Sequence, residues 1–217
     1  MDHLIFTNDG SHSIFSKEIN ENYHSKHGAI SESIHVFIKN GLEKINEKNI
    51  DLLEIGFGTG LNAFLSQNYL EKEKIFCNYY SLEKFPINKD LSNKLNYAKE
   101  LGLNKKKFNE LHDSNWNIAN KLSKYFSLIK IKEDVLYYQT NIKFDIIYFD
   151  AFSPEKQAEM WSEEILNKMF DFLKCGGFLV TYCAKGIIKR RLQKVGFKII
   201  SLPGPTGKRE MTMAMKK

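Results

Sequence analysis

The sequence contains few cysteines and prolines and no long apolar run. Cys77, Cys175 and Cys183 are the only cysteines, and they form no CxxC pair and no zinc-binding spacing with histidine. We therefore predict that they are small core residues and that the protein holds no metal. No stretch reaches the roughly eighteen consecutive apolar residues of a membrane helix, and the N-terminus has no basic start or apolar signal core. These absences predict a cytoplasmic protein that does not associate with membranes.

The composition is that of an ordinary globular protein, with 42% hydrophobic and 27% charged residues. A chain of 217 residues suits one domain with additions better than two domains. The formal net charge of +6 is compatible with a polyanionic partner. Lysine-rich surfaces often serve only solubility, so the positions of the charges carry more information than their sum.

Short apolar segments alternate with helical segments from residue 50 onward. Segments with helical periodicity lie between most of the apolar ones, and crossover connections of this kind produce a parallel sheet covered on both faces. The last two strands are joined by PGPTGKRE without a helix, which predicts an antiparallel pair at one edge. The predicted strands are 51–55, 75–82, 128–132, 144–150, 177–183, 197–201 and 211–215, and the main predicted helices are 61–72, 87–101, 162–173 and 185–195.

The N-terminal part differs from this pattern. Residues 4–16 contain two apolar runs around Asp9-Gly10, which predicts a small β-ribbon with a two-residue turn. Apolar residues at helical spacing between 30 and 45 predict one helix after it. We assign 1–48 to an extension packed on the core and 49–217 to the main α/β domain, with 102–126 as a helical insertion.

A glycine-rich segment directly follows the first predicted strand of the main domain and begins a helix. Its sequence is Glu54-Ile55-Gly56-Phe57-Gly58-Thr59-Gly60-Leu61-Asn62. Glycines permit a sharp turn and close backbone approach to a ligand. The GxGxG spacing differs from the GxGxxG of dinucleotide-binding proteins, which disfavours an NAD-dependent dehydrogenase. The segment resembles the first motif of class I S-adenosylmethionine methyltransferases, with Glu54 as its leading acid.

Three further acids follow predicted strands, where ligands bind in doubly wound folds. Glu83 ends the second strand and is a candidate for the two ribose hydroxyls of the cofactor. Asp134 follows the third strand and is a candidate for the adenine amino group. Asp150 ends the fourth predicted strand and begins the string DAFSP, where a carboxylate can hold or deprotonate an amine. Solvated or structural roles remain the alternatives for Glu83 and Asp134.

Two aromatic residues follow Asp150 in the sequence. The rings of Phe152 and Trp161 are candidates for contacting a sulfonium or stacking on a base, with a place in the core as the alternative for both.

Several strings together are more selective than the glycine motif. They are YHSKHGA at 23–29, GFGTGLN at 56–62, EKFP at 83–86, DAFSP at 150–154, Met160-Trp161 and GKREM at 207–211. On these strings the chain resembles the methyltransferase part of the bacterial bifunctional enzyme that converts 5-aminomethyl-2-thiouridine of tRNA to its 5-methylaminomethyl form. Ala158 departs from the resemblance, which has proline before the Met-Trp pair.

This resemblance implies a seven-stranded, mostly parallel class I fold that binds S-adenosylmethionine. It implies tRNA, in its anticodon region, as partner. The flavin-dependent oxidase half of such enzymes does not fit in 217 residues. We therefore expect no FAD and a separate enzyme that makes the aminomethyl substrate. The cofactor residues implied are Glu54, Gly56, Phe57, Gly58, Thr59, Gly60, Asn62, Glu83, Lys84, Asp134 and Asp150, with Asp150 also the catalytic residue.

Basic residues near the C-terminus suit contacts to tRNA phosphates. The predicted substrate-binding residues are Phe152, Trp161, Lys185, Lys189, Arg190, Arg191, Lys208 and Arg209. A merely solvated helix face is the alternative for the basic ones. For the whole chain, a methyltransferase acting on a small-molecule amine and a non-catalytic RNA- or nucleotide-binding protein remain the alternative functions.

Overall fold

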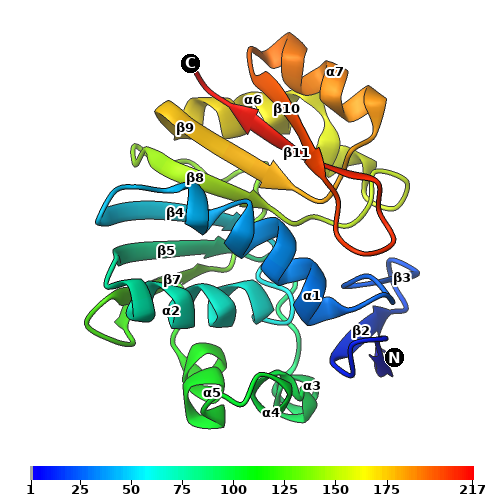
Figure 1. Ribbon diagram of the computed structural model, residues 1–217, viewed down its shortest axis with the longest axis vertical. Helices are drawn as coiled ribbons and strands as arrows, with labels where there is room; N and C mark the ends of the chain where they lie inside the picture. The colour runs from blue at the N-terminus through cyan, green and yellow to red at the C-terminus, as the bar shows by residue number, and fades with distance from the viewer. Residues whose placement is uncertain (1) are drawn as a thin grey trace.

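A computed structural model describes residues 2–217 of the chain (Figure 1). Within these residues an eight-stranded sheet has the order β10-β11-β9-β8-β4-β5-β7-β6, and a separate three-stranded ribbon precedes it. The strands of the large sheet are β4 Asn49–Ile55, β5 Phe76–Leu82, β6 Ala119–Lys121, β7 Phe126–Ile131, β8 Phe144–Phe149, β9 Leu173–Thr181, β10 Lys198–Pro203 and β11 Glu210–Met215. The helices after β4 are α2 Leu61–Glu73, α3 Lys89–Lys94, α4 Tyr97–Glu100, α5 Lys105–Asp113, the short 3-10 helix η3 Ala158–Trp161, α6 Glu163–Phe172 and α7 Gly186–Val195.

Five neighbouring strands, β9-β8-β4-β5-β7, run parallel, and four of them end at one level. Ile55 pairs with Leu82 on one side and with Phe149 on the other, and Leu82 pairs with Ile131. The loops that follow these strands therefore leave the sheet side by side, which is where ligands bind in this kind of fold. The antiparallel pairs β9-β11, β11-β10 and β7-β6 lie at the two edges.

The parallel strands bury side chains on both faces. Leu52, Ile146 and Tyr148 belong to one apolar cluster, which the α2 side of the molecule covers, and the adjacent residues Leu53 and Ile147 belong to a second cluster with α6 and α7. Consecutive strand residues point to opposite faces, so the two layers of helices each cover one face. This arrangement confirms the predicted doubly wound class, with all seven predicted strands present near their predicted positions.

The segment 102–126 differs from the helical insertion that we predicted. Helix α5 occupies its first half, but Ala119–Lys121 forms β6, which pairs antiparallel with β7. The sheet therefore has an eighth strand. Three residues with half-exposed or exposed side chains carry no apolar alternation, so the sequence pattern contains no indication of a strand here.

The N-terminal ribbon consists of β1 His3–Phe6, β2 His12–Ser16 and the unpredicted β3 Glu21–Asn22. The prediction of a two-residue turn was wrong, because Phe6 pairs with His12 and five residues therefore lie between the two strands. The Asp9 side chain stabilises this longer turn by accepting hydrogen bonds from Thr7 Oγ1 and the Ser11 backbone N–H.

The single helix expected over 30–45 is divided into three short helices. They are α1 Ala29–Ser33, the π-helix η1 Ile34–Lys39 and the 3-10 helix η2 Leu42–Lys44. Val36 and Phe37 are buried in the same cluster as Phe64 of α2, so the N-terminal extension contributes to the main core. The domain boundary at residue 48 stays a prediction.

The three cysteines differ in burial. Cys77 and Cys183 are buried as expected, whereas Cys175 is exposed beside the bulge between β8 and β9, and its assignment to the core was wrong. Among the described residues, no helix has the length and hydropathy needed to span a membrane.

Candidate functional site

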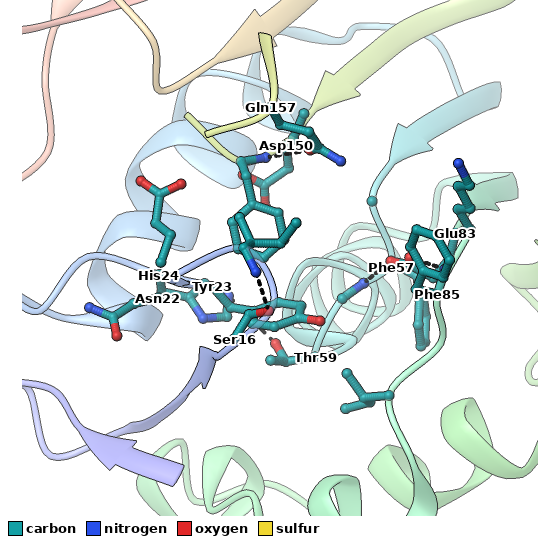
Figure 2. A pocket seen from close by; sticks show the side chains of 18 of the residues that line it. Ser16, Asn22, Tyr23, His24, Phe57, Thr59, Glu83, Phe85, Asp150 and Gln157 are labelled. Carbon is teal, nitrogen blue, oxygen red and sulfur yellow. Dashed lines mark hydrogen bonds between the residues drawn. The ribbon is translucent and has the colours of Figure 1, made fainter. Parts of the chain in front are cut away.

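A cavity of about 1060 Å³ lies where β4, β5, β7 and β8 end. The loop after β4 and the residues directly after β5 and β8 line it, and the N-terminal ribbon and the β10–β11 loop close its other side. Figure 2 shows Tyr23, Thr59, Glu83 and Asp150 around this one cavity. The strand ends therefore form a common site, as the order of motifs predicted.

The backbone of the site continues the sheet by one residue after each strand. Gly56 N–H donates to the Leu82 carbonyl at 2.9 Å, Glu83 N–H to the Ile131 carbonyl at 2.9 Å, and Asp150 N–H to the Ile55 carbonyl at 3.1 Å. These bonds place Glu83 and Asp150 as the first residues beyond the ladder. Their side chains are consequently presented at the rim of the sheet, at the cavity.

At two positions of the loop after β4, other groups of the protein come so close to the backbone that only glycine fits. Gly56 has φ of 92°, and a Cβ there would lie 2.8 Å from the Asp150 carbonyl oxygen. Gly58 has φ of 49°, and its Cβ would lie 3.1 Å from the Tyr23 ring. Both values of φ are in the region that residues with a side chain seldom adopt. The loop thus brings bare backbone to the cavity wall.

Glu83 is oriented by the loops on both sides of it. Its Oε2 accepts a hydrogen bond from Gly58 N–H at 3.0 Å, and its Oε1 accepts from Phe85 N–H at 2.8 Å (Figure 2). Burial raises the pKa of Glu83, and the backbone donors oppose this rise. Each carboxylate oxygen retains acceptor capacity, so the group can take the adjacent hydroxyls of a ribose.

Asp150 lies on the opposite side of the glycine loop from Glu83. Its Oδ2 accepts a hydrogen bond from Asn62 Nδ2 at 2.8 Å. Burial raises the pKa of Asp150 to about 7, although the bond from Asn62 lowers it. A carboxylate with such a pKa takes up and releases protons near neutral pH.

Glu54 does not line the cavity, so the structure does not support its place among the cofactor-contacting residues. It is the penultimate residue of β4 and is fully buried, with Oε2 accepting from Ser81 Oγ at 2.5 Å. Its Oε1 has no hydrogen-bond partner within residues 2–217. Burial raises the pKa of Glu54 to about 8, so the side chain is largely neutral at pH 7. Gly60, the residue before α2, is likewise not part of the lining.

Lys84 and Asp134 line the cavity beside Glu83. Their side chains form an ion pair with an Nζ–Oδ2 distance of 2.9 Å, and Asp134 Oδ1 also accepts from Leu136 N–H at 2.9 Å. The backbone and lysine contacts lower the pKa of Asp134 despite partial burial. The remaining predicted cofactor residues that line the cavity are Phe57, Thr59 and Asn62.

The two aromatic candidates have different positions. Phe152 lines the cavity, and its ring meets the Tyr23 ring edge-to-face at 5.0 Å between centroids. Trp161 is fully buried against Phe149, and its Nε1 donates to the Phe152 carbonyl at 2.8 Å. Trp161 is therefore not part of the cavity wall and supports the loop that carries Phe152, and its contact with a substrate stays a prediction.

Most of the predicted basic surface on α7 is engaged within the protein. Lys185 pairs with Glu155, Lys189 Nζ lies 2.6 Å from Glu210 Oε2, and Arg191 donates to the Trp161 carbonyl at 2.9 Å. None of these three side chains lines the cavity, nor does Arg190. Their contact with a substrate stays a prediction.

The β10–β11 loop carries the other two basic candidates. Lys208 lines the cavity, whereas the following residue, Arg209, is exposed and does not line it. The Lys208 ammonium pairs with Glu32 at 2.6 Å. This loop is thus the part of the predicted basic surface that reaches the site.

The N-terminal extension contributes a wall that sequence reasoning missed. Tyr23, His24 and Glu32 line the cavity, and Glu21 accepts hydrogen bonds at 3.0 Å from the backbone N–H and hydroxyl of Ser153. Burial lowers the pKa of His24 to about 4, so its ring is neutral between Ser13 and Thr59. The string YHSKHGA was the available signal, but its residue types alone did not indicate a role.

Comparison with known proteins agrees with this arrangement. The family described as S-adenosyl-L-methionine-dependent methyltransferase matches residues 110–217. The structure is similar to that of the glycopeptide N-methyltransferase MtfA, with 12% identity, a TM-score of 0.52, and coverage of 87% of this chain and 90% of the other, which concerns the fold alone. The chain belongs to the S-adenosyl-L-methionine-dependent methyltransferases.

Within that class the chain is similar to the MnmC proteins. The crystal structure of MnmC2 from Aquifex aeolicus matches with a TM-score of 0.83 and 27% identity, over 100% of this chain and 70% of the other. The tRNA 5-methylaminomethyl-2-thiouridine biosynthesis bifunctional protein MnmC from Leptospira interrogans is 32% identical over 90% of this chain, and that from Cupriavidus metallidurans is 28% identical over 97%. The chain spans about a third of the length of these two bifunctional relatives, 32% and 33% respectively.

Proposed function

We propose that the protein transfers a methyl group from S-adenosylmethionine to the 5-aminomethyl nitrogen of a wobble (2-thio)uridine in tRNA. The product is the 5-methylaminomethyl nucleoside. The position of Asp150, a proton-accepting carboxylate that shares one cavity with the glycine loop and Glu83, is the observation that carries this proposal. The names of the MnmC relatives support tRNA as the substrate class.

The residues around the glycine loop fit the cofactor. The backbone of Gly56 and Gly58 lines the cavity, Glu83 offers carboxylate oxygens to hydroxyl groups, and Asp134 offers acceptors to an amino group. Bound S-adenosylmethionine supplies an electrophilic methyl group on a positively charged sulfur. The protein has to hold the acceptor nitrogen in line with that methyl group and keep water away.

Asp150 controls the proton of the acceptor amine. An ammonium nitrogen has no lone pair, so one N–H proton must leave before or during formation of the new N–C bond. Asp150 accepts a hydrogen bond from this nitrogen and then takes the proton, while Asn62 keeps the carboxylate in place. Because the reaction modifies an amine that already exists, an enzyme of another class must first install the aminomethyl group on uridine.

The test is an assay of the purified protein with labelled S-adenosylmethionine and tRNA whose wobble uridine carries the aminomethyl group. We expect label in the wobble nucleoside as the methylaminomethyl form. Label only in added small-molecule amines would favour the small-molecule alternative. Tight RNA binding without label in any acceptor would favour a non-catalytic binding protein.

A further inference from the structure

A second carboxylate lines the same cavity as Asp150. Glu32 of α1 is 8% exposed, and its Oε2 accepts a hydrogen bond of 2.9 Å from Ser25 N–H. Its Oε1 accepts one of 2.6 Å from the ammonium of Lys208, which is 176 residues away in the sequence. A nearly buried carboxylate whose backbone bond fixes its orientation is a built binding group rather than a freely rotating surface acid.

An aromatic ring completes the surroundings of the Lys208 ammonium. The Lys208 Nζ atom lies 3.9 Å from the centroid of the Tyr182 ring. The Tyr182 hydroxyl donates a hydrogen bond of 2.9 Å to the carbonyl of Ala151, the residue after Asp150. A primary ammonium is therefore held here between a carboxylate and an aromatic face, a combination that binds cations well.

The side chain that occupies this position has the same chemistry as the proposed acceptor. Lysine ends in a primary alkylammonium, and so does a protonated aminomethyl group. An alkylamine with a pKa near that of lysine, about 10.4, arrives at neutral pH as the ammonium. A site that holds one such group beside Asp150 is suited to hold the other, although not both together.

We propose that Glu32 and Tyr182 bind the ammonium of the incoming amine substrate, and that Lys208 occupies this position until the substrate displaces it. The inference rests on the proposed amine methylation. The docked ammonium gives one proton to the Asp150 carboxylate, which leaves a neutral amine and a neutral acid. Displaced Lys208 remains in the loop with Arg209, where its charge is available to a nucleic-acid phosphate.

The inference predicts a specific kind of selectivity. The protein should prefer RNA with an aminomethyl group over RNA with a neutral hydroxymethyl group of nearly the same size. Charge-assisted hydrogen bonds to a carboxylate of this kind correspond to a preference of about tenfold or more. Contacts to phosphates contribute equally to both RNAs, so they cancel from the ratio of the two affinities.

The experiment measures this ratio by fluorescence anisotropy with the protein saturated by S-adenosylhomocysteine. The probes are two anticodon stem-loops that differ only in 5-aminomethyluridine or 5-hydroxymethyluridine at the wobble position. We expect Glu32→Gln, which keeps an acceptor for Ser25 N–H, to bring the ratio close to one. Lys208→Met should keep or increase the ratio, because it removes the competing ammonium.

Lys194→Met is the matched control, since Lys194 pairs with Glu163 outside the cavity. This variant should keep the wild-type ratio. Tyr182→Leu tests the same site independently of Glu32, and the loss of the aromatic face should reduce the ratio by about threefold or more. Calorimetry with S-adenosylhomocysteine verifies that each variant is folded.

The outcomes separate this inference from the proposed function. Wild-type protein that methylates the aminomethyl RNA, combined with a Glu32→Gln variant that retains the full preference, would overturn the inference and leave the proposed function standing. Wild-type protein that neither methylates nor prefers the aminomethyl RNA would overturn both. If Glu32→Gln and Lys208→Met lost the preference for aminomethyl RNA equally, the Glu32–Lys208 ion pair would have only a structural role, which also overturns the inference.

Discussion

Asn62 donates a hydrogen bond of 2.8 Å to Asp150 and thereby joins the first turn of α2 to the end of β8. The donor favours the charged form of the carboxylate, whereas burial favours the neutral acid. The balance leaves the pKa of Asp150 at about 7. Asn62 is therefore a positioning residue that also adjusts the fraction of Asp150 able to accept a proton.

Replacing Asn62 by alanine should shift the pH dependence of methyl transfer. Loss of the donor raises the pKa of Asp150 further, so less carboxylate is present at pH 7 and the rising limb of kcat/KM moves to higher pH. At pH 7 we expect a decrease of about tenfold in kcat/KM. Asn68→Ala, on the same helix but with a side chain that donates to the Phe64 carbonyl, should leave the pH profile unchanged. Identical profiles for both variants would contradict the role of Asn62.

Asp150→Asn should separate catalysis from cofactor binding. The amide keeps the shape of the side chain but cannot take a proton from the acceptor amine, so kcat should fall by about a hundredfold or more. The Kd of S-adenosylhomocysteine, measured by calorimetry, should change little because Glu83 and the glycine loop are intact. Asp113→Asn, outside the cavity, is the control. An unchanged kcat in Asp150→Asn would remove this residue from the mechanism.

Comparing Gly56→Ala with Gly102→Ala should distinguish the effect of backbone strain, which both variants introduce, from the effect of a steric clash, which only Gly56→Ala introduces. Gly102 has φ of 63°, and no atom lies within 4 Å of the position that an alanine methyl would take there, whereas a methyl at Gly56 meets the Asp150 carbonyl at 2.8 Å. Gly102→Ala should lower the free energy of unfolding by about 1 kcal/mol and leave cofactor affinity unchanged. Gly56→Ala should destabilise more and also weaken S-adenosylhomocysteine binding. Denaturant unfolding and calorimetry measure both effects, and equal behaviour of the two variants would argue against the close-approach role.

Local pattern was sufficient to predict the strand ends and the acids that follow them. Glu83 and Asp150 are each the first residue after a strand; the predicted strand ends, residues 82 and 150, lie within one residue of the observed ends. Glu54 was assigned to the cofactor by motif, yet it lies within β4 and points into the core. Its place before the last strand residue, Ile55, was itself an indication that the side chain belongs to the sheet.

The other half of the cavity depends on contacts that local pattern does not encode. Glu21 meets Ser153 across 132 residues, and Glu32 meets Lys208 across 176. The first pair joins the ribbon to the loop after β8, and the second joins α1 to the β10–β11 loop, so both form only when the N-terminal extension packs against distant parts of the chain (Figure 1). The same holds for the α7 lysines, since their acidic partners come from other segments and convert a predicted basic face into intramolecular ion pairs.

Glu54→Gln should change how stability depends on pH. The folded-state pKa of Glu54, raised by burial to about 8, lies above its ordinary value of 4.5. The unfolded chain therefore loses this proton first, and the free energy of unfolding falls as the pH rises from about 4.5 to 8, by at most about 1.4 kcal/mol per pH unit. His24 and His112, whose pKa values burial lowers to about 4, act in the opposite direction below pH 6.5.

Between pH 6.5 and 8 the two histidines no longer titrate, and Asp150, with a pKa of about 7, is present in both proteins, so the difference between the Glu54→Gln variant and the wild type reports on Glu54. There the glutamine variant should lose less stability than the wild type, and urea unfolding at several pH values measures this difference. Glu164→Gln on α6 is a control. Parallel stability curves for Glu54→Gln and the wild type would show that Glu54 ionises normally in the folded protein.

Arg209→Ala should weaken RNA binding more than Lys194→Ala. Arg209 is exposed, forms no ion pair within the described part of the chain and follows the cavity residue Lys208 in the sequence, whereas the Lys194 ammonium lies 2.7 Å from Glu163. A cation already paired with an acid has less charge to offer a phosphate. If Arg209 contacts one phosphate, its loss should reduce the slope of log Kd against log salt concentration by about 0.7 to 0.9. Binding titrations with the anticodon stem-loop at several salt concentrations measure the slope, and equal slopes for Arg209→Ala and the wild type would place the phosphate contacts elsewhere on the protein.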